Sequence, residues 1–203
     1  MKNSIGLLAV AGLTIAISGC SSTSVQYYAE RSPELIPQQF FDGRLCADGI
    51  VKDYRDRVSR QFSARIMASW DEAGVGKLDE TFQFSDRVDG DYEKRIWTLV
   101  PDGNGSYMAR ANDVPEPVRM EFAGNSLNME YVLHYDTGEG DILKLNMDDW
   151  MFLVNDRTIV NETRMSKFGL TVGRVILTIR KAGPTDLCLP GSLQKTSLER
   201  VSM

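Results

Sequence analysis

Glu80 and Arg95 are the residues best suited to bind or transform a small molecule, because each is charged and alternates with apolar neighbours. Glu80 shares an expected strand face with Leu78 and Phe82, and Arg95 shares one with Trp97. A carboxylate inside an apolar fold is costly unless it is paired or protonated. A guanidinium can hold a carboxylate or a phosphate with two hydrogen bonds. Both side chains could therefore bind the polar end of a ligand, and Glu80 could also act as an acid.

The same two residues have structural interpretations, which stay open at the level of sequence. Glu80 could lie near a solvated mouth of the fold or pair with an arginine, and Arg95 could form a structural ion pair. If Asp89–Gly90 is a two-residue turn, Phe82 lies opposite Trp97. Glu80 then falls four positions away from Arg95 along the paired strand, so contact between them requires a different register or a longer loop.

Asp148 and Asp149 form a second candidate centre. Adjacent residues of a strand point to opposite faces, so these two carboxylates do not form the facing pair that glycoside hydrolysis needs. If Asn155–Asp156 is the next turn, Asp149 faces Glu162, and one face carries a charge cluster. A structural network is the favoured interpretation of this cluster. An oxygen-ligated metal or ligand site is the alternative.

Little else in the sequence indicates catalysis. The only histidine, His134, alternates against Tyr131 and is expected on the exterior. The chain carries no Gly-x-Ser-x-Gly, phosphate-loop, dinucleotide or Cys-x-x-Cys motif. We therefore expect no catalytic residue, no metal and no cofactor, and we predict that the protein is not an enzyme. A lipid-modifying enzyme that uses Glu80 or Asp149 is the minor alternative.

Composition limits both the fold and the partners. The chain has 203 residues, of which 42% are hydrophobic and 25% charged, which suits a single globular domain. Its formal charge is −5 and it has no basic run. Sequence-independent nucleic-acid binding needs clustered Lys and Arg, so we expect no nucleic-acid partner.

The first twenty residues are expected to address the protein to the cell envelope. Lys2 precedes an uncharged run over residues 5–17, which is too short to span about 30 Å of hydrocarbon but suits a secretory signal. The run Ile17-Ser18-Gly19-Cys20 resembles the lipobox of bacterial lipoproteins. This resemblance implies cleavage before Cys20, acylation of Cys20 and a membrane anchor. Ser21 then implies sorting to the outer membrane, with the fold facing the periplasm. The alternative is an ordinary signal with an incidental cysteine.

The elements that must position Glu80 and Arg95 are strands. From Phe40 to Lys181, apolar residues recur at every second position, and no helix is indicated. A two-residue turn at Gly124–Asn125 pairs Phe122 with Leu127, Met120 with Met129 and Val118 with Tyr131, so every inward pair is apolar or aromatic. Further turns are expected at residues 138–140, 155–156 and 168–169.

About ten antiparallel strands joined by short loops would leave two exposed edges unless the sheet closed on itself. We therefore predict an all-β, antiparallel up-and-down barrel of about 8–10 strands, with a two-sheet sandwich as the alternative. Closure places a first strand at 41–51 beside a last strand at 170–180. Cys46 and Cys188 then lie near each other. In an oxidising periplasm they could form a disulfide worth up to about 5 kcal/mol, or they could remain two buried thiols.

The expected organisation has four parts. Residues 1–19 form the signal peptide, and residues 20–37 form a lipidated tether that contains two prolines. Residues 38–183 form the barrel domain. Residues 184–203 form a C-terminal tail, with one helical turn possible at 197–202.

Five short motifs resemble those of a family of uncharacterised proteobacterial lipoproteins that is defined by a domain of unknown function. They are Phe40-Phe41-Asp42-Gly43, Leu78-Asp79-Glu80-Thr81-Phe82, Arg95-Ile96-Trp97, Asp148-Asp149-Trp150-Met151 and Met165-Ser166-Lys167-Phe168-Gly169. The resemblance covers roughly residues 40–181 and implies an envelope protein without an assigned activity. The opening strand and the meander are also similar to those of lipocalins, but the lipocalin Gly-x-Trp is replaced by Gly43-Arg44-Leu45.

Together these features predict an outer-membrane-anchored periplasmic protein that binds or carries a hydrophobic ligand, either a fatty acid or a phospholipid. A barrel of this size can hold one small ligand. Glu80 and Arg95 would contact its polar end. The wall would be formed by Phe82, Trp97, Met129 and Tyr131. The main alternative is a structural or assembly lipoprotein with a filled barrel that acts through its surface.

Overall fold

The structure, a computed structural model, describes residues 23–87 and 91–189. The expected signal peptide (1–19), the acylated Cys20, the turn residues Asp89–Gly90 and residues 190–203 of the expected tail lie outside this part of the chain.

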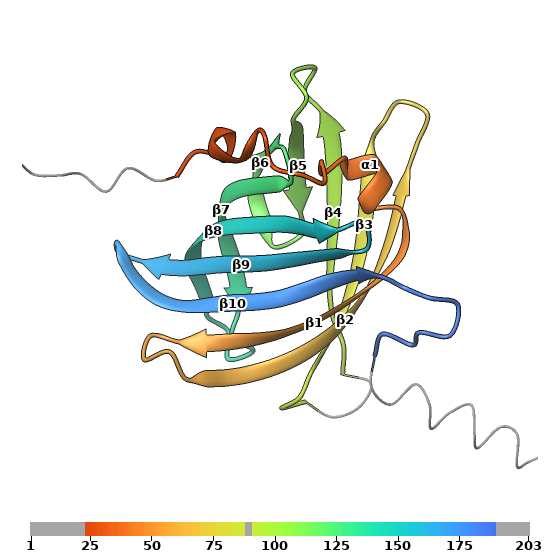
Figure 1. Cartoon of the computed structure of the whole chain (residues 1–203). Coiled ribbons are helices and arrows are strands. Elements are labelled where there is room, and N and C mark those ends of the chain that lie inside the picture. Colours follow the sequence, from red (N-terminus) through yellow and green to blue (C-terminus); the bar gives the residue numbers. More distant parts are fainter. Residues whose placement is uncertain (1–22, 88–90, 190–203) are drawn as a thin grey trace, which may run out of the picture.

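Ten antiparallel strands form a closed barrel in which each strand pairs with the next one in sequence. The strands are β1 (Gly43–Asp53), β2 (Val58–Trp70), β3 (Gly76–Phe84), β4 (Glu93–Pro101), β5 (Tyr107–Ala111), β6 (Val114–Ala123), β7 (Ser126–Asp136), β8 (Ile142–Asn155), β9 (Thr158–Lys167) and β10 (Leu170–Lys181). Figure 1 shows them as one continuous, curved wall. The prediction of an all-β up-and-down barrel is confirmed, and the sandwich alternative is wrong.

The barrel closes between its first and last strands. The β1–β10 ladder runs from the pair Leu45–Lys181 to the pair Asp53–Gly173. The first strand begins and ends two residues later than expected, whereas the last strand matches its expected start. Closure leaves no open sheet edge, which is the physical reason for expecting it in so long a meander.

The two ends of the barrel differ. The loops after β1, β3, β5, β7 and β9 lie together at one end, which we call the hairpin end, because each odd-numbered strand runs toward it. At the other end, the short helix α1 (Pro37–Phe40) lies beside the strand ends (Figure 1). Leu35, Phe40 and Phe41 are buried in the main core there, and the Trp70 indole donates to the Phe41 carbonyl at 2.6 Å. We call this the covered end.

The segment before α1 packs on the outside of the barrel. The 3-10 helix η1 (Val25–Tyr28) contacts β6 and β7, and Tyr28 lies edge-on to Trp150 and Phe152 of β8. The Leu35 amide donates to the Gly124 carbonyl at 2.8 Å. Among the described residues, no helix is both long and apolar enough to cross a bilayer.

The predicted Gly124–Asn125 turn is present, since Ala123 pairs with Ser126 and Phe122 with Leu127. The ladder that follows is shorter than expected. It ends at the Glu121–Asn128 pair and does not include the predicted Met120–Met129 and Val118–Tyr131 pairs. On its other edge β6 pairs with β5, where a bulge near Ala109 bends the sheet.

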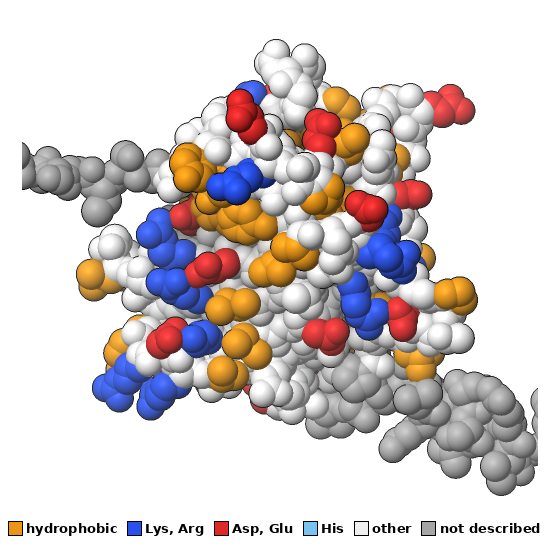
Figure 2. Space-filling view, viewed as in Figure 1, with side chains coloured by type: hydrophobic (Ala, Val, Ile, Leu, Met, Phe, Trp, Pro, Cys, Tyr) orange, Lys and Arg blue, Asp and Glu red, His pale blue; other side chains and the backbone are white. Residues whose placement is uncertain are grey.

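Charged and apolar side chains are mixed over the visible surface (Figure 2). Lys and Arg gather at the left of that view, where Figure 1 places the tips of the β1–β2 and β9–β10 hairpins. This side belongs to the hairpin end.

Candidate functional site

The barrel encloses a partly open cavity of about 350 Å³. It extends from the hairpin end, where Arg60, Phe84 and Tyr135 line it, to the middle of the barrel at Asp149. Most of its wall is apolar. The six residues predicted to bind a ligand, Glu80, Phe82, Arg95, Trp97, Met129 and Tyr131, all line this cavity. Strand alternation brings them there, because each takes an inward position on β3, β4 or β7.

The register of β3 and β4 differs from the expected one, and the difference defines the site. Glu80 pairs directly with Arg95, and Leu78 pairs with Trp97. The predicted pairing of Phe82 with Trp97 is therefore wrong, because the loop between the strands spans residues 85–92 rather than two residues. The observed pairing differs from the expected one by four residues, which is an even number, so each side chain still points to its expected face of the sheet.

Arg95 is neutralised by a residue that sequence analysis did not identify. Its guanidinium forms an ion pair with Asp113 of the β5–β6 turn, with Nη2 and Oδ2 separated by 2.7 Å and Nε donating to the same carboxylate at 2.8 Å. Glu80 and Arg95 are strand partners, but an ion pair between them, one of the alternatives left open by the sequence, is not among the contacts of the described residues. Asp113 lies 18 positions from Arg95, and only the ladder between β4 and β5 brings them together.

Glu80 is the polar group in the cavity without a fixed partner. It forms no hydrogen bond or ion pair with other described residues, and its remaining accessible surface faces the cavity. Burial raises the pKa of Glu80 from its usual 4.5 to about 7, against the opposing effect of the nearby Arg95 charge. Near neutral pH its carboxyl can therefore either donate or accept a hydrogen bond.

Asp149 is, by contrast, fully hydrogen-bonded. It accepts from the Asn161 amide, from the Thr163 hydroxyl at 2.9 Å and from the Tyr131 hydroxyl at 3.4 Å. Burial raises the pKa of Asp149, and the hydrogen bonds from Asn161 and Thr163 oppose this effect. Burial also raises the pKa of Tyr131 well above 10, so its hydroxyl stays protonated and donates.

The predicted pairing of Asp149 with Glu162 is wrong, because the turn lies at residues 156–157 rather than 155–156 and a bulge between Leu153 and Asn155 then shifts the register by one residue. Asp149 instead faces Thr163, and Asp148 lies opposite Arg164, with which it forms an ion pair at 2.8 Å on the outer side. A one-residue shift exchanges the two faces of a strand. The expected charge cluster is thus divided into an inner polar network and an outer ion pair.

Arg60 stands at the hairpin end of the cavity and was also missed by sequence analysis. Its guanidinium lies 3.7 Å from the centre of the Phe84 ring, is bonded to Asp86 at 2.9 Å and reaches the Tyr135 hydroxyl at 3.4 Å. Its position opposite Val51 in β1 could not be located before the strand pairing was known. His134 pairs with Lys144 on the face opposite that of Tyr131.

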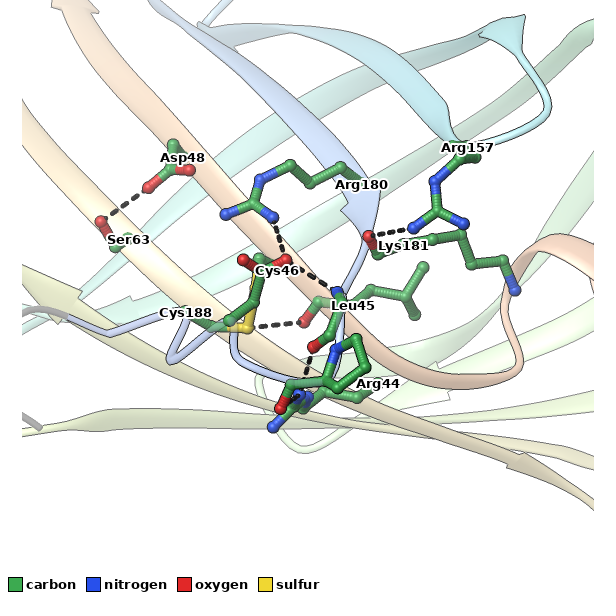
Figure 3. Close-up of a disulfide and its surroundings, with 12 residues drawn as sticks. Arg44, Leu45, Cys46, Asp48, Ser63, Arg157, Arg180, Lys181 and Cys188 are labelled. Atoms are coloured by element: carbon green, nitrogen blue, oxygen red, sulfur yellow. Dashed lines mark hydrogen bonds and ion pairs between the residues drawn. A yellow bond between two sulfur atoms is a disulfide. The ribbon is translucent and has the colours of Figure 1, made fainter.

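Within residues 23–87 and 91–189, no three His, Cys, Asp or Glu side chains come together in a way that could hold a metal ion. The two cysteines in this part of the chain are joined. Cys46 of β1 and Cys188 form a disulfide, with their Cα atoms 4.9 Å apart (Figure 3). Asp186, bonded to Arg180 and to the Gly183 amide, helps to hold the segment that carries Cys188.

The fold and the cavity together define a closed up-and-down barrel with a mostly apolar internal cavity, whose volume is typical of small-molecule sites. The chain belongs to the DUF3833 family, a family of proteins of unknown function, which it matches over residues 14–181. The prediction that the chain belongs to a family defined by a domain of unknown function is confirmed, and the match begins upstream of the expected residues 40–181. No curated protein matches the sequence.

Several solved structures resemble the barrel. One is a protein of unknown function of the DUF3598 family from Nostoc punctiforme, with 14% identity and a TM-score of 0.51 over 74% of this chain and 51% of that one. This chain thus spans about half the length of the DUF3598 protein. Another is the S-type phycobiliprotein lyase CPES from Guillardia theta, with 10% identity and a TM-score of 0.48 over 79% of this chain and 94% of that one.

The second comparison corrects one expectation. The prediction that this protein is not an enzyme rested on the lack of catalytic motifs, and it is contradicted, because one of the solved structures that resemble this chain is named as a lyase. At 10% identity the likeness assigns no reaction to this chain.

Proposed function

We propose that this protein is a membrane-anchored barrel that binds a hydrophobic ligand, either a fatty acid or an acyl chain of a phospholipid. The cavity is the observation that carries the proposal. Its volume of about 350 Å³ falls within the range of roughly 300–1,000 Å³ of small-molecule sites. The cavity argues against the alternative in which side chains fill the barrel.

The size and the lining narrow the ligand class. A volume near the lower limit of that range suits one acyl chain better than a whole two-chain phospholipid. Met129, Met147, Met151 and Met165 line the wall, and their flexible thioethers adapt to a chain that can bend.

Glu80 would bind the polar end of this ligand. Arg95 is already neutralised by Asp113, so it offers a bound carboxylate little net charge. The protonated form of Glu80 can donate a hydrogen bond to the carbonyl or carboxylate oxygen of an acyl ligand. Because burial raises the pKa of Glu80 to about 7, this form is accessible at neutral pH.

The proposed location is the periplasmic face of the outer membrane. The lipobox-like run that ends at Cys20, followed by Ser21, supports acylation and this sorting. The Cys46–Cys188 disulfide supports an oxidising compartment. The anchor would hold the barrel beside a source of acyl chains.

A second candidate function is an enzyme that acts on the bound molecule. The supporting observation is Glu80, a carboxyl with a pKa raised to about 7 that faces a cavity without a fixed partner, as a general acid or base requires. Turnover of phospholipid vesicles by the wild-type protein, lost in Glu80→Gln, would support this candidate. Turnover that Glu80→Gln leaves unchanged would eliminate Glu80 as the catalytic group.

Native mass spectrometry of the full chain, together with titration of a fluorescent fatty acid, tests the binding function. We expect one ligand per chain in the wild-type protein. Ala47→Phe should abolish uptake, because Ala47 is a buried wall residue of the cavity and the larger ring fills the space. Ala73→Phe is the matched control, since Ala73 is exposed in the β2–β3 loop.

Leu145→Phe is a second cavity-filling variant, on a different strand of the same wall. It keeps the test valid if Ala47→Phe fails to fold. Loss of uptake in both cavity variants, with thermal unfolding still cooperative, supports the proposal. A wild-type protein that carries no lipid and takes up no fluorescent fatty acid contradicts it. Equal uptake by the wild-type and both filled variants contradicts the cavity as the site.

A further inference from the structure

Exposed apolar side chains gather at the tips of two neighbouring hairpins beside the cavity mouth. Phe168 is 90% exposed and Leu170 71% exposed at the β9–β10 tip. Tyr54 is 66% exposed and Val58 50% exposed at the β1–β2 tip. The two hairpins are adjacent because β1 pairs with β10. We call these four residues the rim patch.

Folding does not account for Phe168 at its position. Its φ angle is +52°, in the left-handed region where a bulky side chain is strained and glycine or asparagine is favoured. The ring is almost fully exposed, so it contributes little to the core. A residue that strains the backbone without gaining burial points to a role outside the fold.

Basic side chains flank the rim patch. The Arg55 guanidinium lies 5.1 Å from the centre of the Tyr54 ring, and the Lys167 ammonium lies 5.4 Å from that of Phe168. Within the described residues, neither Arg55 nor Lys167 forms an ion pair, whereas Lys52 and Arg57 of the same hairpin pair with Asp56 and Asp53.

The hairpins around the cavity mouth therefore differ in the charges that they carry. Figure 2 shows Lys and Arg at the side where the β1–β2 and β9–β10 hairpins lie. The β7–β8 loop carries Asp136, Glu139 and Asp141 instead. Although the formal charge of the chain is −5, two cations that form no ion pair within the described part of the chain, Arg55 and Lys167, lie beside the exposed rim patch.

We propose that the rim patch, with Arg55 and Lys167, docks onto the surface of an anionic lipid bilayer. Exposed aromatic and aliphatic tips with basic neighbours match the chemistry of such a surface, which takes apolar groups at its interface and attracts cations. The strands that carry the patch also line the cavity through Val51 of β1 and Val175 of β10. Docking would set the mouth of the barrel beside the acyl chains, which deepens the proposed function but does not require a ligand.

Tryptophan reporters in the full-length chain test the docking. Phe168→Trp places the reporter in the rim patch. Val154→Trp is the matched control, because Val154 is 52% exposed on β8 near the covered end. With phosphatidylglycerol vesicles that contain brominated lipid, we expect a blue shift and strong quenching for Phe168→Trp and neither for Val154→Trp, after subtraction of the wild-type signal.

The charge requirement is tested in the same reporter. Arg55→Gln and Lys167→Gln should each lower the ratio of docked to undocked protein by about fivefold, and added salt or pure phosphatidylcholine should lower it further. Equal quenching of the two reporters, or none at Phe168→Trp, would overturn the docking. A concentration-dependent blue shift of Phe168→Trp without vesicles would indicate a second copy as the occupant and would also overturn it.

The Trp reporters lie on the surface and not in the cavity, so they report docking, whereas native mass spectrometry and the cavity-filling variants report uptake. Docking without lipid uptake would leave the rim proposal standing while the proposed function fails. Lipid uptake without docking would contradict the rim proposal and leave the proposed function supported.

Discussion

Glu80 lowers the stability of the folded protein when its carboxyl is charged and the cavity holds no ligand. Its carboxyl faces the cavity, and burial raises its pKa from 4.5 to about 7. Asp149, in the same interior, receives three hydrogen bonds from neighbouring side chains. Because an ordinary structural carboxylate is satisfied in this second way, the unsatisfied Glu80 is the better candidate for ligand contact.

Replacing Glu80 should stabilise the empty protein at high pH. The folded state keeps the Glu80 proton at pH values where the unfolded chain releases it, so wild-type stability falls as pH rises from 4.5 through 7. Glu80→Gln removes this loss. Urea unfolding should show nearly equal stabilities at pH 4.5 and an advantage for the variant of at most about 3 kcal/mol at pH 8. A difference that does not change with pH would contradict the assignment.

At the scale of elements, two departures from simple pairing build the interior. The long loop between β3 and β4 moves their register so that Glu80 meets Arg95, and the bulge in the β8–β9 ladder turns Thr163 toward Asp149. An even shift preserves the faces of a strand, and an odd shift exchanges them. The first change therefore altered only neighbours, whereas the second altered which residues are buried.

The Cys46–Cys188 disulfide adds a covalent link at the place where β1 and β10 pair and close the barrel. Cys46 and Cys188 are separated by 142 residues, and cross-linking so long a loop restricts the unfolded chain strongly. Replacing both cysteines with serine should lower the free energy of unfolding by about 3–5 kcal/mol in denaturant titrations. Wild-type protein measured with a reductant should match the variant. A decrease in the free energy of unfolding of less than about 1 kcal/mol would show that the β1–β10 ladder keeps the barrel closed without the disulfide.

The whole molecule combines a closed wall, a covered end and a mouth at the hairpin end. The buried Leu35, Phe40 and Phe41 fill the covered end, so the cavity extends toward the other one. The rim patch lies beside that mouth. Docking and binding would thus act at the same end of the barrel.

Ligand binding should stabilise the whole barrel. A ligand that binds only the folded state, present at 100 times its dissociation constant, adds about 2.7 kcal/mol to the free energy of unfolding. Thermal unfolding of the wild-type protein with a saturating fatty acid should therefore shift upward. Ala47→Phe, whose cavity is filled, should show no shift. A shift of equal size in both proteins would place the ligand outside the barrel.

Sequence alone was enough for the architecture. The alternation through Phe62, Ala64 and Ile66, repeated along the chain, predicted strands and their inward faces, and the number of strands predicted closure. The six proposed ligand residues share the cavity for the same reason, because a side-chain period of two depends only on local geometry. Family membership could also be read from short motifs.

Tertiary structure decided which polar groups meet. The Arg95–Asp113 ion pair, the Asn161–Asp149 hydrogen bond and the position of Arg60 at the mouth all depend on loop lengths and bulges between strands. Alternation carries no information about register, since strands slipped by two residues present the same faces. Outside β9, where the bulge exchanged the two faces, the sequence thus determined which residues point inward. Only the closed sheet determined the partners of these residues and left Glu80 without one.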